Sequence, residues 1–205
     1  MSNDTIDLNS LDNADLAEAY IEGNDEAYSV IEERLESESA YDFCFKHYES
    51  DDSDRVLALL EHLDDASSIH PSDVTELSYD HYGLTLLDVG GNEYAVGTDD
   101  QCDSAVTEHI RQSLWAFTPS FLSSQTDLPE EVFAALSEQC EGANDAIERI
   151  VEKCVEGGVE AFAEQAAACD GRGHFLGSYD GEENEVCFDV RKKDSYEYFN
   201  VYRVN

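Results

Sequence analysis

Residues 84–97, LTLLDVGGNEYAVG, decide the fold class of this 205-residue chain. Two short β-type runs, Leu84–Val89 and Glu93–Gly97, flank the triplet Gly90-Gly91-Asn92. Glycine and asparagine readily adopt the positive φ angles that tight hairpin turns require. The stretch therefore predicts a β-hairpin in a chain whose other segments have mostly helical periodicity.

The segment before the hairpin is expected to be helical. Apolar residues recur with helical spacing from Asp12 to about Tyr48, with an interruption at Gly23-Asn24. Ser53 is expected to cap a further helix, because apolar residues follow it at i, i+3, i+4 and i+7: Val56, Leu59, Leu60 and Leu63. Pro71 ends this helical region.

Two helices are expected soon after the hairpin. Asp99, Asp100 or Asp103 can cap a helix that reaches Phe117, and the triplet 118–120, which contains a proline, is expected to break it. Asp127 is expected to cap the next helix, with Pro129 in its first turn and acidic residues that complement the helix dipole.

The remaining segments add two helices, a loop and two strands. Asn144 is expected to cap one helix, and an alanine-rich helix covers residues 159–168. A glycine-bearing loop over 171–181 precedes strands near 186–190 and 196–204. The predicted class is α+β, mostly helical with a small antiparallel β-sheet. We expect an acidic helical region over 1–80 and an α+β domain over 81–205, with the hairpin, helices and C-terminal strands.

The charge of the chain is strongly negative and uneven. Its 48 acidic and 11 basic residues give a formal charge of −37, and residues 1–110 contain 29 of the acidic residues but only three basic ones. Direct binding of nucleic acid is excluded as a bulk property, because phosphate contacts need clustered Lys and Arg. An anionic membrane would repel the protein too. Residues 1–15 lack the apolar core of a signal peptide, and no apolar run approaches the ~18 residues of a membrane span. The expected location is the cytoplasm.

Two explanations compete for this charge, since self-repulsion disfavours a compact state. In the first, carboxylates on neighbouring helices imitate the phosphates of DNA and bind a basic partner. The candidate partner-binding residues lie in the acidic first half: Glu32, Glu33, Glu36, Glu38, Asp51, Asp52, Asp54, Glu61, Asp64 and Asp65. In the second, the acids adapt the protein to concentrated salt, which screens repulsion beyond ~3 Å at molar ionic strength.

An enzyme is a third and less favoured interpretation. The glycine-bearing loop places four polar residues within ten positions: Arg172, His174, Tyr179 and Asp180. Histidine can transfer a proton near neutral pH, and Arg172 or Asp180 could orient it or a substrate. The sequence associates no nucleophile with this loop. Hydrogen bonds from Arg172 and His174 to loop carbonyls, or pairing of these residues with neighbouring acids, explain the same pattern. We therefore predict no catalytic residues and no cofactor.

Neither the acidic clusters nor the cysteines predict a metal site. Asp99, Asp100 and Asp103 have a spacing that can hold Mg²⁺, but helix capping explains them more simply. The six cysteines form no C-x-x-C pair and are expected to be reduced thiols. Cys140 and Cys154 fall on apolar helix stripes and are expected to pack in the core. Trp115, Phe117 and Phe121 form the densest aromatic cluster, which we also assign to the core.

Several segments of the second half resemble a family of small uncharacterised proteins encoded by bacteriophages and other mobile elements. They include Ser113–Phe117, Phe121-Leu122, Gly142–Ile147, the loop Gly171–Gly181 and Tyr202–Asn205. The resemblance spans about residues 84–205 and implies an accessory protein of a mobile element, made in a host cell. It implies no biochemical role.

The sequence-based hypothesis is a DNA-mimic inhibitor of a phage or mobile element. Its expected partner is a basic nucleic-acid-binding protein of the host, such as a defence or regulatory protein, whose groove the acidic surface would occupy. The alternatives are a salt-adapted accessory protein and, third, a small enzyme that uses Arg172, His174 and Asp180. The sequence leaves the oligomeric state open.

Overall fold

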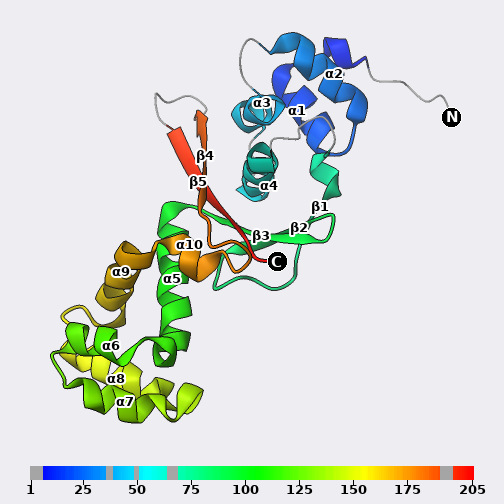
Figure 1. Cartoon of the computed structure of the whole chain (residues 1–205). Coiled ribbons are helices and arrows are strands. Elements are labelled where there is room, and N and C mark those ends of the chain that lie inside the picture. Colours follow the sequence, from blue (N-terminus) through cyan, green and yellow to red (C-terminus); the bar gives the residue numbers. More distant parts are fainter. Residues whose placement is uncertain (1–6, 36–38, 49–50, 64–68, 190–195) are drawn as a thin grey trace.

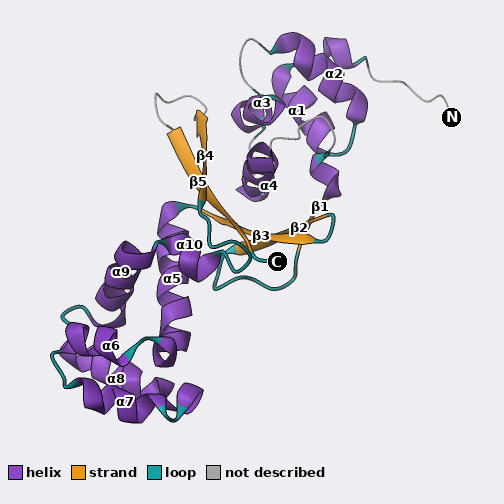
Figure 2. Ribbon diagram, in the orientation of Figure 1, coloured by secondary structure: helices purple, strands orange, loops and turns teal. Residues whose placement is uncertain are grey.

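A five-stranded antiparallel sheet lies between two groups of helices (Figure 1). The structure is a computed structural model that describes residues 7–35, 39–48, 51–63, 69–189 and 196–205. Figure 2 shows the sheet between the N-terminal helices on one face and the later helices on the other. The predicted class, α+β and mostly helical with a small antiparallel sheet, is confirmed.

The first group of helices covers one face of the sheet. It consists of α1 (Asn13–Ile21), α2 (Asp25–Arg34), α3 (Ala40–His47) and α4 (Asp51–Leu63). The predicted interruption at Gly23-Asn24 is confirmed, because Gly23 has a φ of 105° between α1 and α2. The predicted cap at Ser53 is wrong, since α4 already begins at Asp51.

The sheet has the strand order β1-β2-β3-β5-β4. Its strands are β1 (Val74–Glu76), β2 (Thr85–Val89), β3 (Asn92–Gly97), β4 (Asn184–Asp189) and β5 (Tyr196–Arg203). The predicted hairpin is confirmed, with Val89 opposite Asn92. Both predicted C-terminal strands are also present, and β5 pairs with β3 on one side and β4 on the other.

The second group of helices covers the opposite face. It consists of α5 (Asp99–Ser113), α6 (Pro119–Thr126), α7 (Glu130–Ser137), α8 (Asn144–Cys154), α9 (Gly158–Asp170) and α10 (Arg172–Leu176). Short 3-10 turns occur at Leu8–Ser10, Pro71–Asp73, Leu114–Ala116 and Cys140–Ala143. The segment 171–181, expected to be a loop, therefore contains the short helix α10.

Several predicted helix boundaries in this group are wrong. The helix expected to reach Phe117 ends at Ser113 and is followed by the 3-10 turn Leu114–Ala116. The predicted break at 118–120 is confirmed, but a helix that was not predicted, α6, begins at Pro119 with Thr118 as its N-cap, because proline fits the first helical turn. Asp127 ends α6 in the left-handed conformation, with a φ of 57°, and does not cap α7. Thr98 rather than an aspartate caps α5, and Asn144 follows the cap position of α8.

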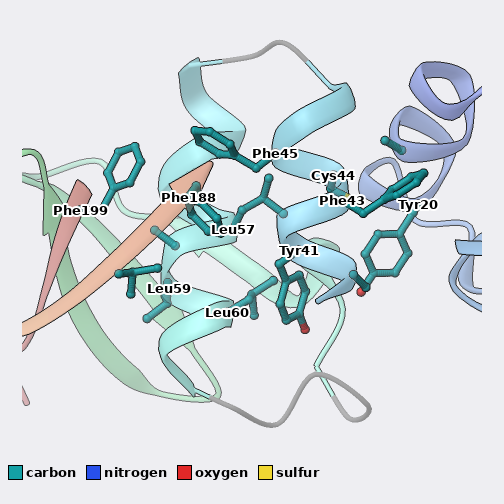
Figure 3. Close-up of a cluster of buried hydrophobic side chains, with 14 of the residues drawn as sticks. Tyr20, Tyr41, Phe43, Cys44, Phe45, Leu57, Leu59, Leu60, Phe188 and Phe199 are labelled. Carbon is teal, nitrogen blue, oxygen red and sulfur yellow. The ribbon is translucent and has the colours of Figure 1, made fainter. Parts of the chain in front are cut away.

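The two faces of the sheet are buried in separate cores because successive side chains along a strand point to opposite faces. The first core joins α1–α4 to one face through residues such as Val96, Phe188 and Phe199. In Figure 3, Phe45 of α3 lies beside Phe188 of β4, and their rings stack at 4.5 Å. The second core joins α5–α10 to the other face, where Leu86 and Tyr202 point.

Helix α4 is buried more completely than its predicted stripe implies. Four consecutive residues are buried: Leu57, Ala58, Leu59 and Leu60. The helix contacts α3 and also strands β3, β4 and β5, so neighbours cover it on two sides. Figure 3 shows Leu57, Leu59 and Leu60 between α3 and the sheet.

The cysteine predictions are only partly correct. All six cysteines are free thiols. Cys44 and Cys102 are buried, but Cys140 and Cys154 are exposed, so their predicted core packing is wrong. Helix α8 buries only Ile147 and Val151, so its apolar face is narrower than the periodicity suggests. Cys140 lies in a turn with a φ of 50°.

Candidate functional site

The structure describes part of the predicted acidic surface. Glu32 and Glu33 are exposed on α2. Asp54 and Glu61 lie half-buried on α4, and Glu61 accepts a 2.6 Å hydrogen bond from Ser39 Oγ at the N-cap of α3. Asp51 and Asp52 begin α4, where the structure describes the backbone alone. Four predicted residues lie outside the described residues: Glu36, Glu38, Asp64 and Asp65.

Helices α1 and α2 carry further exposed acids that sequence reasoning did not name. Together with Glu32 and Glu33 they form what we call the α1–α2 acidic surface: Asp15, Glu18, Glu22, Asp25, Glu26, Glu32 and Glu33. Asp15 and Glu18 of α1 and its C-cap residue Glu22 recur at i, i+3 and i+7, which places them on one side of the helix. The buried Leu16 and Tyr20 lie on the other side of the helix. This separation of acidic and apolar residues is visible in the sequence and could have identified the acidic side of α1.

Arg111 gathers carboxylates from two other helices. Its guanidinium lies 2.8 Å from Glu148 and 3.4 Å from Glu152 on α8, and 2.9 Å from Glu160 on α9. The hydrogen bond to Glu148 raises the pKa of Arg111 above its ordinary value, against the opposing effect of burial. This cluster therefore binds α5 to α8 and α9.

Arg172, the first of the four candidate residues in the predicted loop, is at the centre of a second cluster. It donates to Asp99 at 2.8 Å, to Asp103 at 3.1 Å and, through Nε, to Glu183 at 3.1 Å. Burial lowers the pKa of Arg172, but the hydrogen bonds to Glu183 and Asp99 outweigh it and the pKa is raised. The hydrogen bond between Arg172 and Asp99 also lowers the pKa of Asp99. The cluster holds α10 against the beginning of α5.

The other three candidate residues in the predicted loop have different neighbours. Tyr179 is 60% exposed, and the guanidinium carbon of Arg203 lies 3.7 Å from its ring centroid. Asp180 accepts a 3.0 Å hydrogen bond from the backbone N–H of Glu182. His174 is exposed, with its ring perpendicular to that of Phe175. The four side chains thus contact separate partners.

His174 lines a cavity of about 350 Å³ beside the second core. The cavity is bordered by α5, α6, α9 and α10, and nine residues line it: His109, Ser113, Ala116, Phe117, Thr118, Phe121, Asp170, His174 and Phe175. The predicted packing of the cluster of Trp115, Phe117 and Phe121 against the core is confirmed, since all three pack half-buried against the second core. Sequence reasoning did not identify the cavity.

Two half-buried histidines lie near this cavity. His81 has Nε2 at 2.9 Å from the carbonyl oxygen of Leu176, and burial lowers its pKa. Burial also lowers the pKa of His109, and the neighbouring His81 and His174 lower it further. The ring of Tyr82 lies between them, at 4.9 Å from His81 and 4.7 Å from His109.

The part of the chain that the structure describes shows neither a metal site nor a membrane-spanning helix. No group of three or more His, Cys, Asp or Glu residues in this part of the chain is placed to hold a metal ion. Among the helices described, none is both long enough and apolar enough to cross a membrane.

Comparison of the chain with family models, curated proteins and solved structures finds no match. The resemblance to proteins of mobile elements therefore stays a prediction from the sequence.

Proposed function

We propose that the protein is a DNA-mimic inhibitor whose α1–α2 acidic surface occupies the basic nucleic-acid groove of a host defence or regulatory protein. The observation that carries the proposal is the contrast between exposed acids and engaged cations. The α1–α2 acidic surface exposes seven carboxylates, whereas Arg34, Arg111 and Arg172 bind groups within the protein. The surface therefore presents a negative field to a partner.

Arg34, the arginine on α2 itself, donates its hydrogen bonds to neutral groups and not to the acids of this surface. Arg34, the last residue of α2, donates to Asn13 Oδ1 at 2.9 Å and to the carbonyl oxygen of Leu11 at 3.0 Å. Both acceptors are neutral, so Arg34 holds the N-terminal turn against α2. The two arginine clusters, at Arg111 and Arg172, belong to the other helical group.

The spacing of the acids supports mimicry. Asp15, Glu18 and the C-cap residue Glu22 share one side of α1, so a rise of 1.5 Å per residue places a carboxylate about every 5 Å along the axis. One DNA strand carries a phosphate about every 3.4 Å. Acids on the adjacent helix α2 bring the combined density closer to that of DNA. A basic groove would thus meet a comparable array of negative charge.

The partner follows from this chemistry. Salt screens the attraction between a groove lined by Lys and Arg and a carboxylate array, as it does for DNA, so binding should weaken steeply with salt. Such a decoy would suit the mobile element that the sequence resemblance implies, because it blocks restriction enzymes, CRISPR effectors or repressors. We place this activity in the cytoplasm of the host cell.

The test is charge-neutral substitution of two matched surfaces. One variant changes five acids of the α1–α2 acidic surface to glutamine: Glu18, Glu22, Glu26, Glu32 and Glu33. The control changes five exposed glutamates of the second helical group: Glu130, Glu131, Glu138, Glu141 and Glu156. Each variant is used to capture proteins from host lysate at low and high salt, and captured proteins are assayed for DNA binding.

We expect the unmodified protein to capture a basic DNA-binding protein that high salt releases. The α1–α2 variant should lose at least tenfold in affinity for it, whereas the control should change less than threefold. Equal losses in the two variants would contradict the assignment of the surface. Failure to capture any DNA-binding protein at low salt would contradict the proposed function itself.

Salt adaptation remains the second candidate, and one observation favours it. Exposed acids also cover the second helical group, for example Glu130, Glu141 and Glu164, so the charge is not confined to one face. A salt-adapted protein should unfold in dilute buffer, because screening of the repulsion is lost. A mimic should stay folded there, which circular dichroism at low ionic strength measures directly.

A further inference from the structure

We infer that the cavity bordered by α5, α6, α9 and α10 binds a small organic cation, an alkylated ammonium group on a short apolar body. The cavity lies among helices of the second group, and α1–α4 pack on the other face of the sheet (Figure 1). The inference therefore does not depend on the proposed function. The cavity has a volume of about 350 Å³, which is at the lower end of the range for small-molecule sites and suits a compact ligand.

The apolar wall of the cavity consists of aromatic rings. Phe117 lies between Phe121 and Phe175, with ring centroids at 5.5 Å and 6.3 Å, and both pairs are nearly parallel. Phe162 supports this row from the core, with its ring nearly perpendicular to those of Phe117 and Phe121. Aromatic faces attract cations, and quaternary ammonium ligands are bound in this way by aromatic cages.

Two helix C-termini add negative potential at the same place. The last residues of α5 and α9, Ser113 and Asp170, both line the cavity. The C-terminus of a helix carries a partial negative charge, and Asp170 adds a full carboxylate charge to it. The beginning of α6 also borders the cavity, and the N-terminus of a helix carries a partial positive charge. There, Thr118 Oγ1 accepts a hydrogen bond from the backbone N–H of Phe121 and so satisfies one of the free N–H groups of α6.

No lysine or arginine competes for this position, and the two histidines that line the cavity are His109 and His174. Neither lysine nor arginine is among the nine lining residues, and Arg111, on the last turn of α5, binds Glu148, Glu152 and Glu160 instead. The lowered pKa of His109 keeps its imidazole neutral near pH 7. An anionic ligand would meet the carboxylate of Asp170 and the charge of −37 carried by the chain. Charge and lining thus select a cation.

A matched pair of ligands tests the charge requirement. Choline and its neutral isostere 3,3-dimethyl-1-butanol have the same shape, and benzyltrimethylammonium is a larger cationic probe. Binding is measured by titration calorimetry in 0.5 M NaCl, which screens the overall field. The fluorescence of Trp115 provides a second readout, because it is the single tryptophan of the chain. It precedes Ala116, which lines the cavity. We expect the cations to bind at least tenfold more tightly than the alcohol.

Matched variants test the site. Asp170→Asn should weaken choline binding about fivefold, whereas Glu164→Gln, which removes one exposed charge from the same helix outside this cavity, should change it less than twofold. Phe121→Leu keeps an apolar side chain but removes the ring, and should weaken binding about fivefold or more. Circular dichroism and the thermal midpoint check that each variant is folded.

Three results would overturn the inference. The first is no binding of either cation at millimolar concentration by the unmodified, folded protein. The second is equal binding of choline and the neutral alcohol, which would make the cavity merely apolar. The third is an equal effect of Asp170→Asn and Glu164→Gln. This result would show that the preference for cations comes from the net negative charge of the chain and not from the carboxylate in the cavity.

Discussion

The guanidinium of Arg172 lies 2.8 Å from the carboxylate of Asp99 and so joins the beginning of α10 to the beginning of α5. Because Asp103 and Glu183 share this guanidinium, Arg172→Ala would leave three carboxylates close together without their common cation. We expect the free energy of unfolding to fall by about 1–3 kcal/mol, the usual effect of losing hydrogen bonds to a charged group. Urea denaturation measures it.

The control for this prediction is Arg149→Ala, which removes the same charge from an exposed position on α8. Its effect should stay within about 0.5 kcal/mol, as at most surface positions. The loss caused by Arg172→Ala should also shrink in 1 M salt, because screening weakens the repulsion among the three acids. Equal effects of the two substitutions would show that net charge, and not the cluster, determines stability.

Gly173 is predicted to tolerate no side chain. A Cβ atom there would overlap the carbonyl oxygen of Gly181 and lie 2.8 Å from the carbonyl carbon of Glu182. Because both neighbours are backbone atoms, Gly173→Ala must displace the chain, and we expect a destabilisation of roughly 1–3 kcal/mol. At Gly142 a Cβ would meet nothing within 4 Å, so Gly142→Ala is the matched control. Thermal unfolding compares the two, and a similar midpoint for both would refute the prediction.

Stability is predicted to fall as the pH drops from 7 to 5.5. His81 and His109 have pKa values below the ordinary value because they are buried, so the unfolded chain binds protons near pH 6.5 before the folded protein does. The free energy of unfolding therefore decreases as the pH falls through this range. Most carboxylates ionise at lower pH and contribute little there.

The measurement is a set of denaturation curves between pH 7 and 5.5, with an NMR titration of the imidazole protons. His109→Gln removes one of the titrating groups and should reduce the pH dependence of stability. An unchanged slope in this variant, or a His109 pKa at or above the ordinary value, would contradict the assignment of burial as the cause.

The fold was predictable where the signal is local. The hairpin at 90–92 depends on turn chemistry within a few residues, and the predicted α+β class followed from it. Strand β1 was missed because three residues, Val74–Glu76, are too few to show a period. The burial of four consecutive residues of α4, 57–60, depends on the sheet that covers this helix, and its apolar stripe alone could not indicate a second buried side.

The candidate sites were harder to predict for the same reason. The exposed acids of α1 were readable from their spacing opposite Leu16 and Tyr20. The cavity was not, because its lining comes from four helices between His109 and Phe175. Pairing of Arg172 with neighbouring acids was one of the expected explanations, but only the structure shows that Asp99 and Glu183 are the acids beside it. Asp127 shows the converse limit, since aspartate suits both a helix N-cap and a left-handed residue.

The position of β5 between β3 and β4 affects how the protein can fold during synthesis. On the ribosome, the hairpin of β2 and β3 emerges early, but β4 has no place in the sheet until residues 196–203 have left the exit tunnel. Both helical layers pack on faces that β5 helps to form, through Phe199 and Val201 on one side and Tyr202 on the other. Until then the nascent chain keeps apolar surface on both layers exposed, and its many negative charges would keep such unfinished chains apart.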